Sequence, residues 1–287
     1  MGDRVAVVTD TNSGIMPDQA ADLGLQVVPM PCEIDGEEFF EGVSVTSEQF
    51  YERLAAGSDV STSQPLPADL DRAWRAALAE ADEVVYIPMS SGLSGSCTSA
   101  LNFSNLYEGR VHVVDNKRIS VTQRESALDA LRWAREGLSA AQIARRLEQT
   151  ALNASIYLMV DTMDQLRKGG RVTPAAASIG SMLKIKPVLQ IQGAKLDTFA
   201  VCRSVKSGMR TLLDALRRDV EDRFGGVEKV HLYVAHTNRP AQAADLAERI
   251  VELFGGGVEV FVDRLPLSIA CHTGEGALGV ACALREA

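Results

Sequence analysis

Three short segments of the chain carry hydroxyl or imidazole groups among glycines or beside proline, a combination suited to binding a small oxyanion. They are Ser61-Thr62-Ser63-Gln64-Pro65, Ser90-Ser91-Gly92-Leu93-Ser94-Gly95-Ser96 and His272-Thr273-Gly274-Glu275-Gly276-Ala277-Leu278-Gly279. Hydroxyl groups donate hydrogen bonds to an anion, and glycines allow the backbone to approach it closely. We expect each segment to be a loop at a strand end, and the three together to form an oxyanion receptor.

The middle segment gives the strongest signal, since it follows an apolar run at 83–89 and precedes a predicted helix over 97–107. The N-terminus of a helix presents free N–H groups and a partial positive charge, and both favour an anion. The hydroxyls of Ser94 and Thr62 would complete the set of donors.

The same residues also permit an enzymatic interpretation. The run GLSGS at 92–96 approaches the G-x-S-x-G nucleophile elbow, so Ser94, His272 and an aspartate could form a hydrolase triad. However, serine replaces the last glycine of the elbow. The Ser, Asp, His order expected of that fold is met only if Asp115 or Asp161 is the acid. A serine hydrolase therefore stays an alternative.

Aspartates at strand ends receive a structural interpretation. Asp10, Asp115 and Asp161 each end an apolar, strand-like run, where aspartate more often caps a helix or fixes a turn than catalyses a reaction. Their pattern does not predict a metal site.

The histidines divide into structural and functional candidates. His112 and His231 fall inside strand patterns, and His236 stands just before a helix start, which is typical of a capping loop. His272 differs because glycines at 274, 276 and 279 give its neighbourhood a backbone freedom that a packed core does not need. We therefore take His272 as the functional candidate.

The elements that must position these residues alternate along the first half of the chain. Strand-like runs at 5–9, 26–30, 84–88 and 111–115 are separated by helical patterns at 17–23, 47–56, 68–80, 97–107 and 124–136. This alternation predicts a mostly parallel sheet flanked by helices, in which ligands bind beyond the carboxyl ends of the strands. A turn signal within 33–39 predicts a small hairpin at the edge of that sheet.

The second half predicts another α/β domain that contains a hairpin. After a helix at 140–151, strands are expected at 155–160, 187–191, 195–201, 229–235 and 258–262, with the hairpin turning at Gly193. A loop is expected at Lys168-Gly169-Gly170-Arg171, and helices at 174–183, 206–223, 239–254 and 276–283. The predicted domains are residues 1–154 and 155–287.

Composition excludes several function classes. The 287 residues carry a net charge of −9 and no dense run of Lys or Arg, which argues against nucleic acid as a partner. The five cysteines form no C-x-x-C pair, as expected for reduced thiols of a cytoplasmic protein without a zinc site. No apolar run is long enough to span a bilayer, so we expect no integral membrane association. No phosphate-binding loop for ATP or NAD is present, and no cofactor is expected.

Motifs along nearly the whole chain resemble the DegV family of fatty-acid-binding proteins. Besides the STSQP, SSGLSG and HTG segments, the resemblance rests on Val7-Val8-Thr9-Asp10, Val113-Val114-Asp115, Lys168-Gly169-Gly170-Arg171, Ile185-Lys186-Pro187 and Gly276-Ala277-Leu278-Gly279. It implies two α/β domains that hold a long-chain fatty acid in a buried pocket between them.

The resemblance also implies residue roles. The residues that would bind the carboxylate are Thr62, Ser94, Gly95, His272 and Thr273. The protein would have no catalytic activity of its own. It would be the lipid-binding subunit of a bacterial fatty acid kinase, whose separate ATP-binding subunit phosphorylates the bound fatty acid to an acyl phosphate for phospholipid synthesis. Docking of that kinase subunit is expected to involve Arg171 and Arg203.

Four stretches depart from the family pattern. They are Thr11-Asn12-Ser13, Asn116, Ser120-Val121-Thr122-Gln123 and Glu275. The first, third and fourth are expected near the pocket. A second alternative is therefore a carrier of another amphiphilic carboxylate.

Overall fold

The computed structural model describes residues 4–179, 185–192 and 195–286. The chain divides into two compact units, 1–152 with 266–268, and 153–265 with 269–287. The predicted boundary at 154 differs from this division by two residues. The prediction also placed segment 266–268 in the second domain, whereas it belongs to the first unit. That segment is tied to the first unit, because Leu267 N donates to Glu41 Oε2 at 2.7 Å and Ser268 Oγ donates to Asn12 Oδ1 at 2.6 Å.

A parallel sheet with the strand order β2-β1-β6-β7 forms the centre of the first unit. Its strands are β1 (Val5–Asp10), β2 (Gln26–Val28), β6 (Glu83–Ile87) and β7 (Val111–Val113). In register, Val7 of β1 pairs with Val85 of β6, and Thr9 with Ile87. These runs are rich in valine and isoleucine, as expected for strands that are covered on both faces. The predicted parallel α/β sheet is confirmed.

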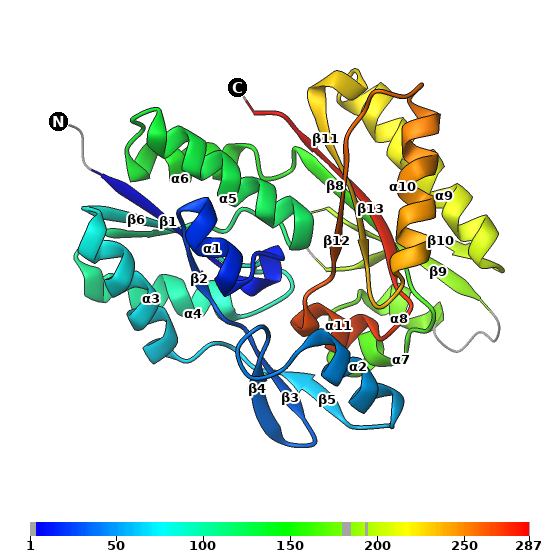
Figure 1. The fold of residues 1–287 in the computed structure, drawn as a ribbon, viewed down its shortest axis with the longest axis horizontal. Helices are drawn as coiled ribbons and strands as arrows, with labels where there is room; N and C mark the ends of the chain where they lie inside the picture. Colours follow the sequence, from blue (N-terminus) through cyan, green and yellow to red (C-terminus); the bar gives the residue numbers. More distant parts are fainter. Residues whose placement is uncertain (1–3, 180–184, 193–194, 287) are drawn as a thin grey trace. The chain divides into compact units, whose positions relative to one another are not determined.

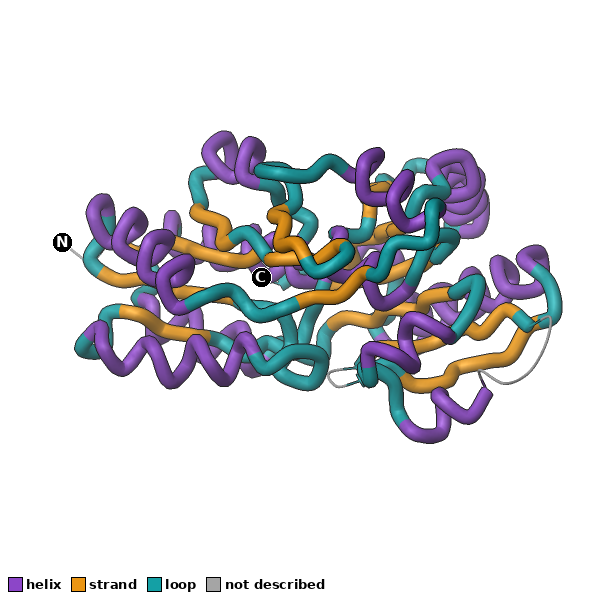
Figure 2. The backbone as a smooth tube through the Cα atoms, turned by 90° about the horizontal axis from the view of Figure 1, so that it is seen from below, coloured by secondary structure: helices purple, strands orange, loops and turns teal. Residues whose placement is uncertain are grey.

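Helices cover both faces of this sheet (Figure 2). Successive residues of a strand point to opposite faces, so Val7 packs with helices α1, α5 and α6, whereas Val8 packs with α3 and α4. The helices are α1 (Pro17–Leu23), α3 (Pro67–Glu80), α4 (Ser96–Ser104), α5 (Ser120–Arg135) and α6 (Ala140–Gln149). Trp74 of α3 is fully buried against Tyr86 of β6, with ring centroids 5.5 Å apart.

A second, smaller sheet in the first unit has the strand order β4-β3-β5. Strands β3 (Pro31–Ile34) and β4 (Glu37–Phe40) form the predicted hairpin, turning at Asp35 and Gly36, which both have positive φ. The prediction that this hairpin lies at the edge of the parallel sheet is wrong, because β3 pairs instead with β5 (Val60–Thr62). Helix α2 (Ser47–Ala55) lies between β4 and β5 in the chain.

The second unit is built on a mixed sheet with the strand order β10-β9-β8-β13-β11-β12. Its strands are β8 (Ala154–Met159), β9 (Lys186–Ile191), β10 (Asp197–Cys202), β11 (Val230–His236), β12 (Val260–Arg264) and β13 (Leu278–Leu284). The antiparallel pairing of β9 with β10 confirms the predicted hairpin, although its expected turn at Gly193 lies outside the described residues.

The predicted helix over 276–283 is wrong. These residues contribute to β13, which pairs antiparallel with both β8 and β11. A strand buried on both faces has a continuous apolar sequence, and periodicity cannot distinguish it from a buried helix. The helix in this region is α11 (Leu267–Thr273), a short segment without a clear sequence signal.

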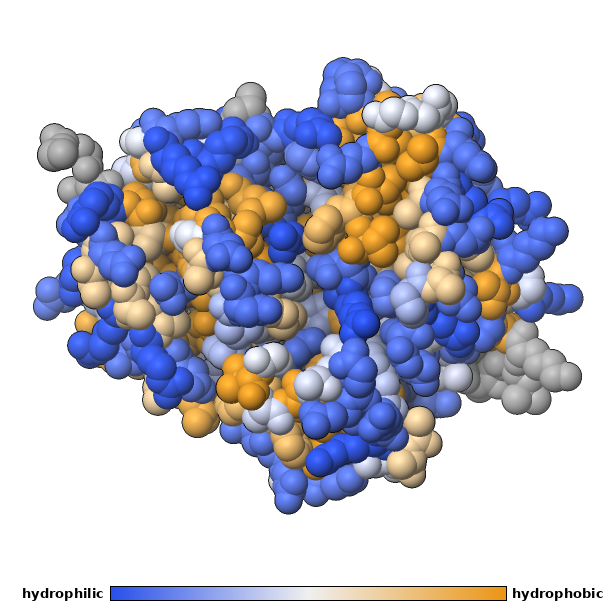
Figure 3. All heavy atoms as spheres, viewed as in Figure 1, coloured by the Kyte–Doolittle hydropathy of each residue, from blue (hydrophilic) through white to orange (hydrophobic). Residues whose placement is uncertain are grey.

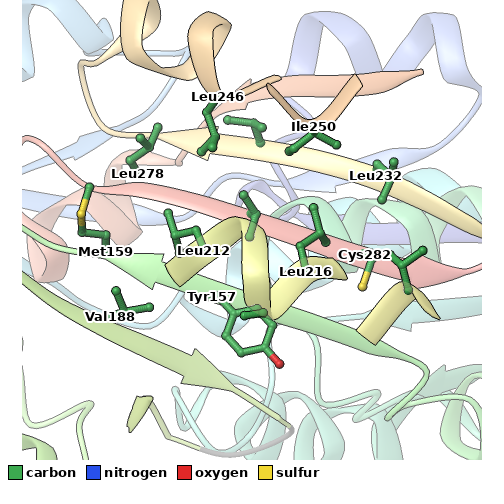
Figure 4. Close-up of a cluster of buried hydrophobic side chains, with 14 of the residues drawn as sticks. Tyr157, Met159, Val188, Leu212, Leu216, Leu232, Leu246, Ile250, Leu278 and Cys282 are labelled. Carbon is green, nitrogen blue, oxygen red and sulfur yellow. The ribbon is translucent and has the colours of Figure 1, made fainter. Parts of the chain in front are cut away.

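Two helices cover one face of this sheet, α9 (Val205–Arg218) and α10 (Pro240–Leu253) (Figure 1). In Figure 4, Leu212 and Leu216 of α9 lie over Tyr157 and Cys282 of the sheet. Two short helices, α7 (Asp164–Gly169) and α8 (Pro174–Ile179), follow β8. The predicted end of α8 near residue 183 lies outside the described residues.

Strand β12 forms one edge of the second unit's sheet and carries exposed apolar side chains. Phe261 is 38% exposed and Val262 is 40% exposed, and Figure 3 shows apolar surface over this strand. In the parts of the chain that the structure describes, no helix combines the length and apolar character needed to cross a membrane.

Candidate functional site

The small sheet of the first unit positions Thr62. Thr62 is the last residue of β5, and its register partner is Cys32 of β3. The preceding residue, Ser61, donates from Oγ to Glu33 Oε2 at 2.8 Å, which anchors the start of the STSQP segment. Thr62 is half-buried, as is Ser63, and so faces partly toward solvent. The predicted loop begins only at Ser63, because Ser61 and Thr62 are still part of β5.

Asp10 anchors the second loop, at the carboxyl end of the parallel sheet. Its Oδ2 accepts the Met89 N–H at 3.0 Å, and its Oδ1 accepts Gln123 Nε2 at 2.9 Å and Asn12 N at 3.1 Å. Burial raises the pKa of Asp10, and these hydrogen bonds oppose that shift. The structural interpretation of Asp10 as a turn-fixing residue agrees with this geometry.

Asp115 anchors the same loop two residues further along, at Ser91. The Ser91 N–H donates to Asp115 Oδ1 at 3.1 Å, and Ser91 Oγ donates to Asp115 Oδ2 at 2.5 Å. Lys117 Nζ donates to Ser91 Oγ at 2.9 Å and also forms an ion pair with Asp115. Although burial opposes it, the hydrogen bonds from Lys117 and Ser91 lower the pKa of Asp115. The carboxylate is therefore a structural clamp on the loop.

Gln64 joins the two loops of the first unit. Its Oε1 accepts the Ser99 hydroxyl of α4 at 2.6 Å. A Cβ added at Gly95 would lie 2.9 Å from Gln64 Nε2, so a side chain at 95 would push Gln64 aside. The loop that carries Thr62 and the loop that carries Ser94 are therefore in contact. Sequence reasoning placed Gln64 in a motif but assigned it no role, because a bridge between distant segments has no local signature.

Ser94 presents a hydroxyl whose hydrogen is uncommitted. Ser94 Oγ accepts the Ser96 N–H at 3.1 Å, and no other hydrogen bond of this hydroxyl is found among the described residues, while the Ser94 N–H donates to the Ser90 carbonyl at 3.2 Å. Helix α4 begins at Ser96, and its N-cap residue Gly95 provides no side-chain cap. The predicted helix over 97–107 corresponds to α4 followed by a 3-10 turn at Asn105–Tyr107. A hydroxyl and a helix N-terminus thus offer donors to an anion.

His272 lies in a helix of the second unit, and the prediction that it lies in a loop at a strand end is wrong. It is the sixth residue of α11 and is partly buried. Its ring lies against Gly169, where an added Cβ would overlap His272 Nδ1. The H-T-G and K-G-G-R motifs are therefore in contact. The predicted loop at 168–171 is also corrected, since Lys168 and Gly169 end α7 and Gly170 is its C-cap with a φ of 68°.

Burial lowers the pKa of His272 to about 4, and the positive charge of Arg171 adds to this shift. Arg171 is held in place because its Nη1 donates to the Gly169 carbonyl. The imidazole is therefore neutral at physiological pH. A general base works best with a pKa near the working pH, so this environment disfavours His272 as the base of a serine hydrolase.

The loop after α11 is fixed by residues that follow β11. Thr237 Oγ1 donates to the Gly274 carbonyl at 2.8 Å and accepts the Ala277 N–H at 2.8 Å. Gly276 has a φ of 91°, and a Cβ there would lie 2.5 Å from Asp161 Oδ2. The buried Thr273 donates from Oγ1 to the Ile269 carbonyl at 3.3 Å, within α11.

Charged residues of the second unit differ in how firmly they are held. Asp161 pairs with Lys186 Nζ at 2.8 Å and with Arg239 Nη2 at 3.1 Å, which supports its structural interpretation. Arg203 is exposed in the connection between β10 and α9. His236 ends β11, and its Nδ1 accepts the Arg239 N–H at 3.1 Å, as expected of a capping loop.

No cluster of three or more His, Cys, Asp or Glu suited to a metal ion occurs within the described ranges.

Comparisons with known proteins agree with these motifs. The family model described as "Uncharacterised protein, DegV family" matches residues 4–285. A DegV domain-containing protein of Deinococcus radiodurans is 33% identical over 280 residues, which cover 96% of this chain and 97% of that protein.

Two solved structures share the fold. A fatty-acid-binding DegV family protein from Thermus thermophilus is 30% identical with a TM-score of 0.88, covering 98% of this chain and 100% of its own. DegV from Bacillus subtilis, a fatty acid binding protein, is 27% identical with a TM-score of 0.87, covering 99% of this chain and 100% of its own. The chain therefore belongs to the DegV family.

Proposed function

We propose that this protein binds a long-chain fatty acid and holds its carboxylate with Thr62, Ser94 and Gly95. The observation that carries the proposal is the contact of the two loops through Gln64, with the Ser94 hydroxyl uncommitted beside the N-terminus of α4. The fatty-acid-binding relatives from Thermus thermophilus and Bacillus subtilis support the same ligand class.

The two ends of such a ligand would contribute differently. Burial of the acyl chain is worth about 0.8 kcal/mol per methylene, or on the order of 10 kcal/mol for a hexadecanoyl chain before the costs of association. The chain therefore sets the affinity. Removing a carboxylate from water costs several kcal/mol unless hydrogen bonds replace its hydration. The hydroxyls and helix N–H groups replace that hydration and set the orientation.

The proposal extends to presentation of the carboxylate to a separate ATP-dependent kinase subunit, which forms the acyl phosphate. Neutral donors suit this role, because they bind a carboxylate without reducing its basicity as strongly as an arginine pair would. We assign the protein itself no catalytic step. Arg171 and Arg203 are the proposed docking residues, and Arg203 is exposed as docking requires.

Substitution of the carboxylate donors tests the binding site. A hydrogen bond to a charged group is worth about 1.5–3 kcal/mol, so Ser94→Ala or Thr62→Ala should weaken palmitate binding roughly ten- to a hundredfold. Ser104→Ala is the matched control, because the Ser104 hydroxyl is exposed and donates to the Leu101 carbonyl of α4. Titration with palmitate measures the effect, and unchanged affinity in both variants would refute the assignment.

Kinase docking is tested separately from binding. With palmitate-loaded protein, ATP and the kinase subunit, acyl phosphate is trapped as the hydroxamate. Arg203→Ala and Arg171→Ala should lower its formation while palmitate affinity is kept, whereas Arg72→Ala on α3 should change neither. Because Arg171 also holds the Gly169 carbonyl, Arg203→Ala is the cleaner variant. Normal transfer with both variants would refute the docking assignment.

The roles expected of His272 and Thr273 stay predictions. His272→Gln and Thr273→Val retain similar volume but remove the imidazole and the hydroxyl. If these residues contact the carboxylate, each variant should retain less palmitate than the wild-type protein. If palmitate retention is unchanged, the ligand contacts are confined to residues of the first unit.

A further inference from the structure

The serine hydroxyls of the loop Ser90–Ser96 are not equivalent. Lys117 Nζ can only donate, so Ser91 Oγ accepts from it and must send its own hydrogen to Asp115. Ser91 is therefore fully committed. Ser94 accepts one N–H and keeps its hydrogen. Ser96 is different again, because its Oγ is buried and has no partner among the described residues.

Ser96 is only 2% exposed, so water does not readily satisfy its hydroxyl. Burying a hydroxyl without a hydrogen-bond partner destabilises a folded protein, whereas alanine at the same position would avoid that cost. Such an orphaned group in a native fold calls for an explanation, and an absent ligand is one. The sequence motifs contain Ser96 but assign its hydroxyl no role.

The position of Ser96 matches that of an anion-binding residue. Ser96 is the first residue of α4, whose N-cap residue Gly95 has no side chain to cap it, and the Ser96 N–H donates to Ser94 Oγ at 3.1 Å. Ser94 and Ser96 stand on either side of Gly95 in the chain, at the positive end of the helix.

We propose that Ser96 is a second serine that binds the ligand's carboxylate and makes the site selective for a free acid. This inference rests on the proposed function. A carboxylate has two oxygens and about four acceptor positions, so it can accept from Ser94 and Ser96 together. An ester of the same chain carries no charge and accepts more weakly, and the buried Ser96 hydroxyl would gain less from it.

The test uses the full-length protein after removal of bound lipid, and compares wild type with Ser96→Ala, Ser96→Thr and the control Ser104→Ala. The unfolding temperature and the affinities for palmitate and methyl palmitate are measured for each. Ser96→Ala should raise the unfolding temperature of the lipid-free protein by about 2–4 °C. It should also weaken palmitate binding by about tenfold and reduce the preference for palmitate over methyl palmitate. Ser96→Thr keeps the hydroxyl, so it should restore the palmitate affinity and the preference for palmitate over methyl palmitate.

In Ser96→Ala, a higher unfolding temperature together with weaker palmitate binding distinguishes a binding role of the hydroxyl from a structural one. Ser96→Ala protein that is less stable and binds less palmitate would show a structural hydroxyl and overturn the inference. Unchanged palmitate affinity in Ser96→Ala, with Ser94→Ala impaired, would overturn the inference but keep the proposed function. Wild-type protein that binds no palmitate would contradict both.

Discussion

The two units present their motif residues in different chemical environments. In the first unit, Ser94 lies beside the N-terminus of α4 in a loop rich in neutral hydroxyls. The ion pair between Lys117 and Asp115 holds Ser91 of the same loop. In the second unit, the His272 ring packs against Gly169. Its burial and the positive charge of Arg171 lower its pKa. The first environment suits retention of an anion, whereas the second suits a group that must stay neutral.

The largest expected effect concerns His272 and stability. Its pKa is lowered to about 4 in the folded protein, against about 6.5 when unfolded. Protonation of His272 therefore leaves the free energy of unfolding unchanged above pH 6.5. As the pH falls toward 4, it lowers this free energy by up to about 3 kcal/mol. His236 contributes in the same direction, so the measurement is the difference between wild type and His272→Gln in urea unfolding at each pH. Parallel pH profiles would contradict the buried, neutral imidazole.

The contact between Gly169 and His272 can be broken directly. Gly169→Ala places a Cβ where His272 Nδ1 lies, and overpacking of this kind costs about 1–3 kcal/mol. The expected destabilisation should largely disappear in the background of His272→Ala, which removes the clashing ring. A double-mutant cycle by urea unfolding measures this coupling. Additive effects of the two changes would show that the side chains do not meet.

In the first unit, the Asp115 clamp should matter less than the histidine contact. Asp115→Asn leaves Lys117 without its ionic partner and weakens two bonds to Ser91, with an expected cost of about 1–2 kcal/mol in unfolding free energy. Asp82→Asn, which removes an exposed ion pair with Arg4, should cost less than about 1 kcal/mol. Equal losses for the two variants would mean that the clamp does not hold the loop.

The smallest expected effect is that of the bridge between the two loops. Gln64→Ala removes the acceptor of the Ser99 hydroxyl without removing any proposed ligand donor. We expect palmitate affinity to fall about three- to fivefold, which corresponds to a net hydrogen bond of about 1 kcal/mol. Ser99→Ala should reproduce the loss and, combined with Gln64→Ala, should add little to it. An additive double variant would rule out the bridge.

Local signals explain which elements could be predicted from the sequence. Helix α1 has proline at its first position and Gly24 with a φ of 83° after its end, and its limits were predicted correctly. Strand β13 was predicted as a helix because it is buried on both faces and therefore lacks the period of two. Helix α5 begins at Ser120, four residues before the predicted start at 124, because its first turn consists largely of buried polar side chains.

The candidate site shows the same limit. The motifs indicated which loops carry Thr62 and Ser94, since hydroxyls and glycines stand out against an apolar chain. They did not indicate that Gln64 bridges the loops or that the Ser91 hydroxyl donates to Asp115. They also did not indicate that the buried Ser96 hydroxyl has no hydrogen-bond partner among the described residues. Those properties depend on side chains that are distant in sequence or on burial, and neither has a local pattern.

Native mass spectrometry of the purified protein, followed by denaturing extraction of the bound molecule, tests the central claim most directly. We predict an excess mass of one long-chain fatty acid per chain, and a lower occupancy in Ser94→Ala than in Ser104→Ala. Another amphiphilic carboxylate in the extract would keep the carrier role and change its ligand. A wild-type protein that carries no such molecule and does not bind added palmitate would contradict the account.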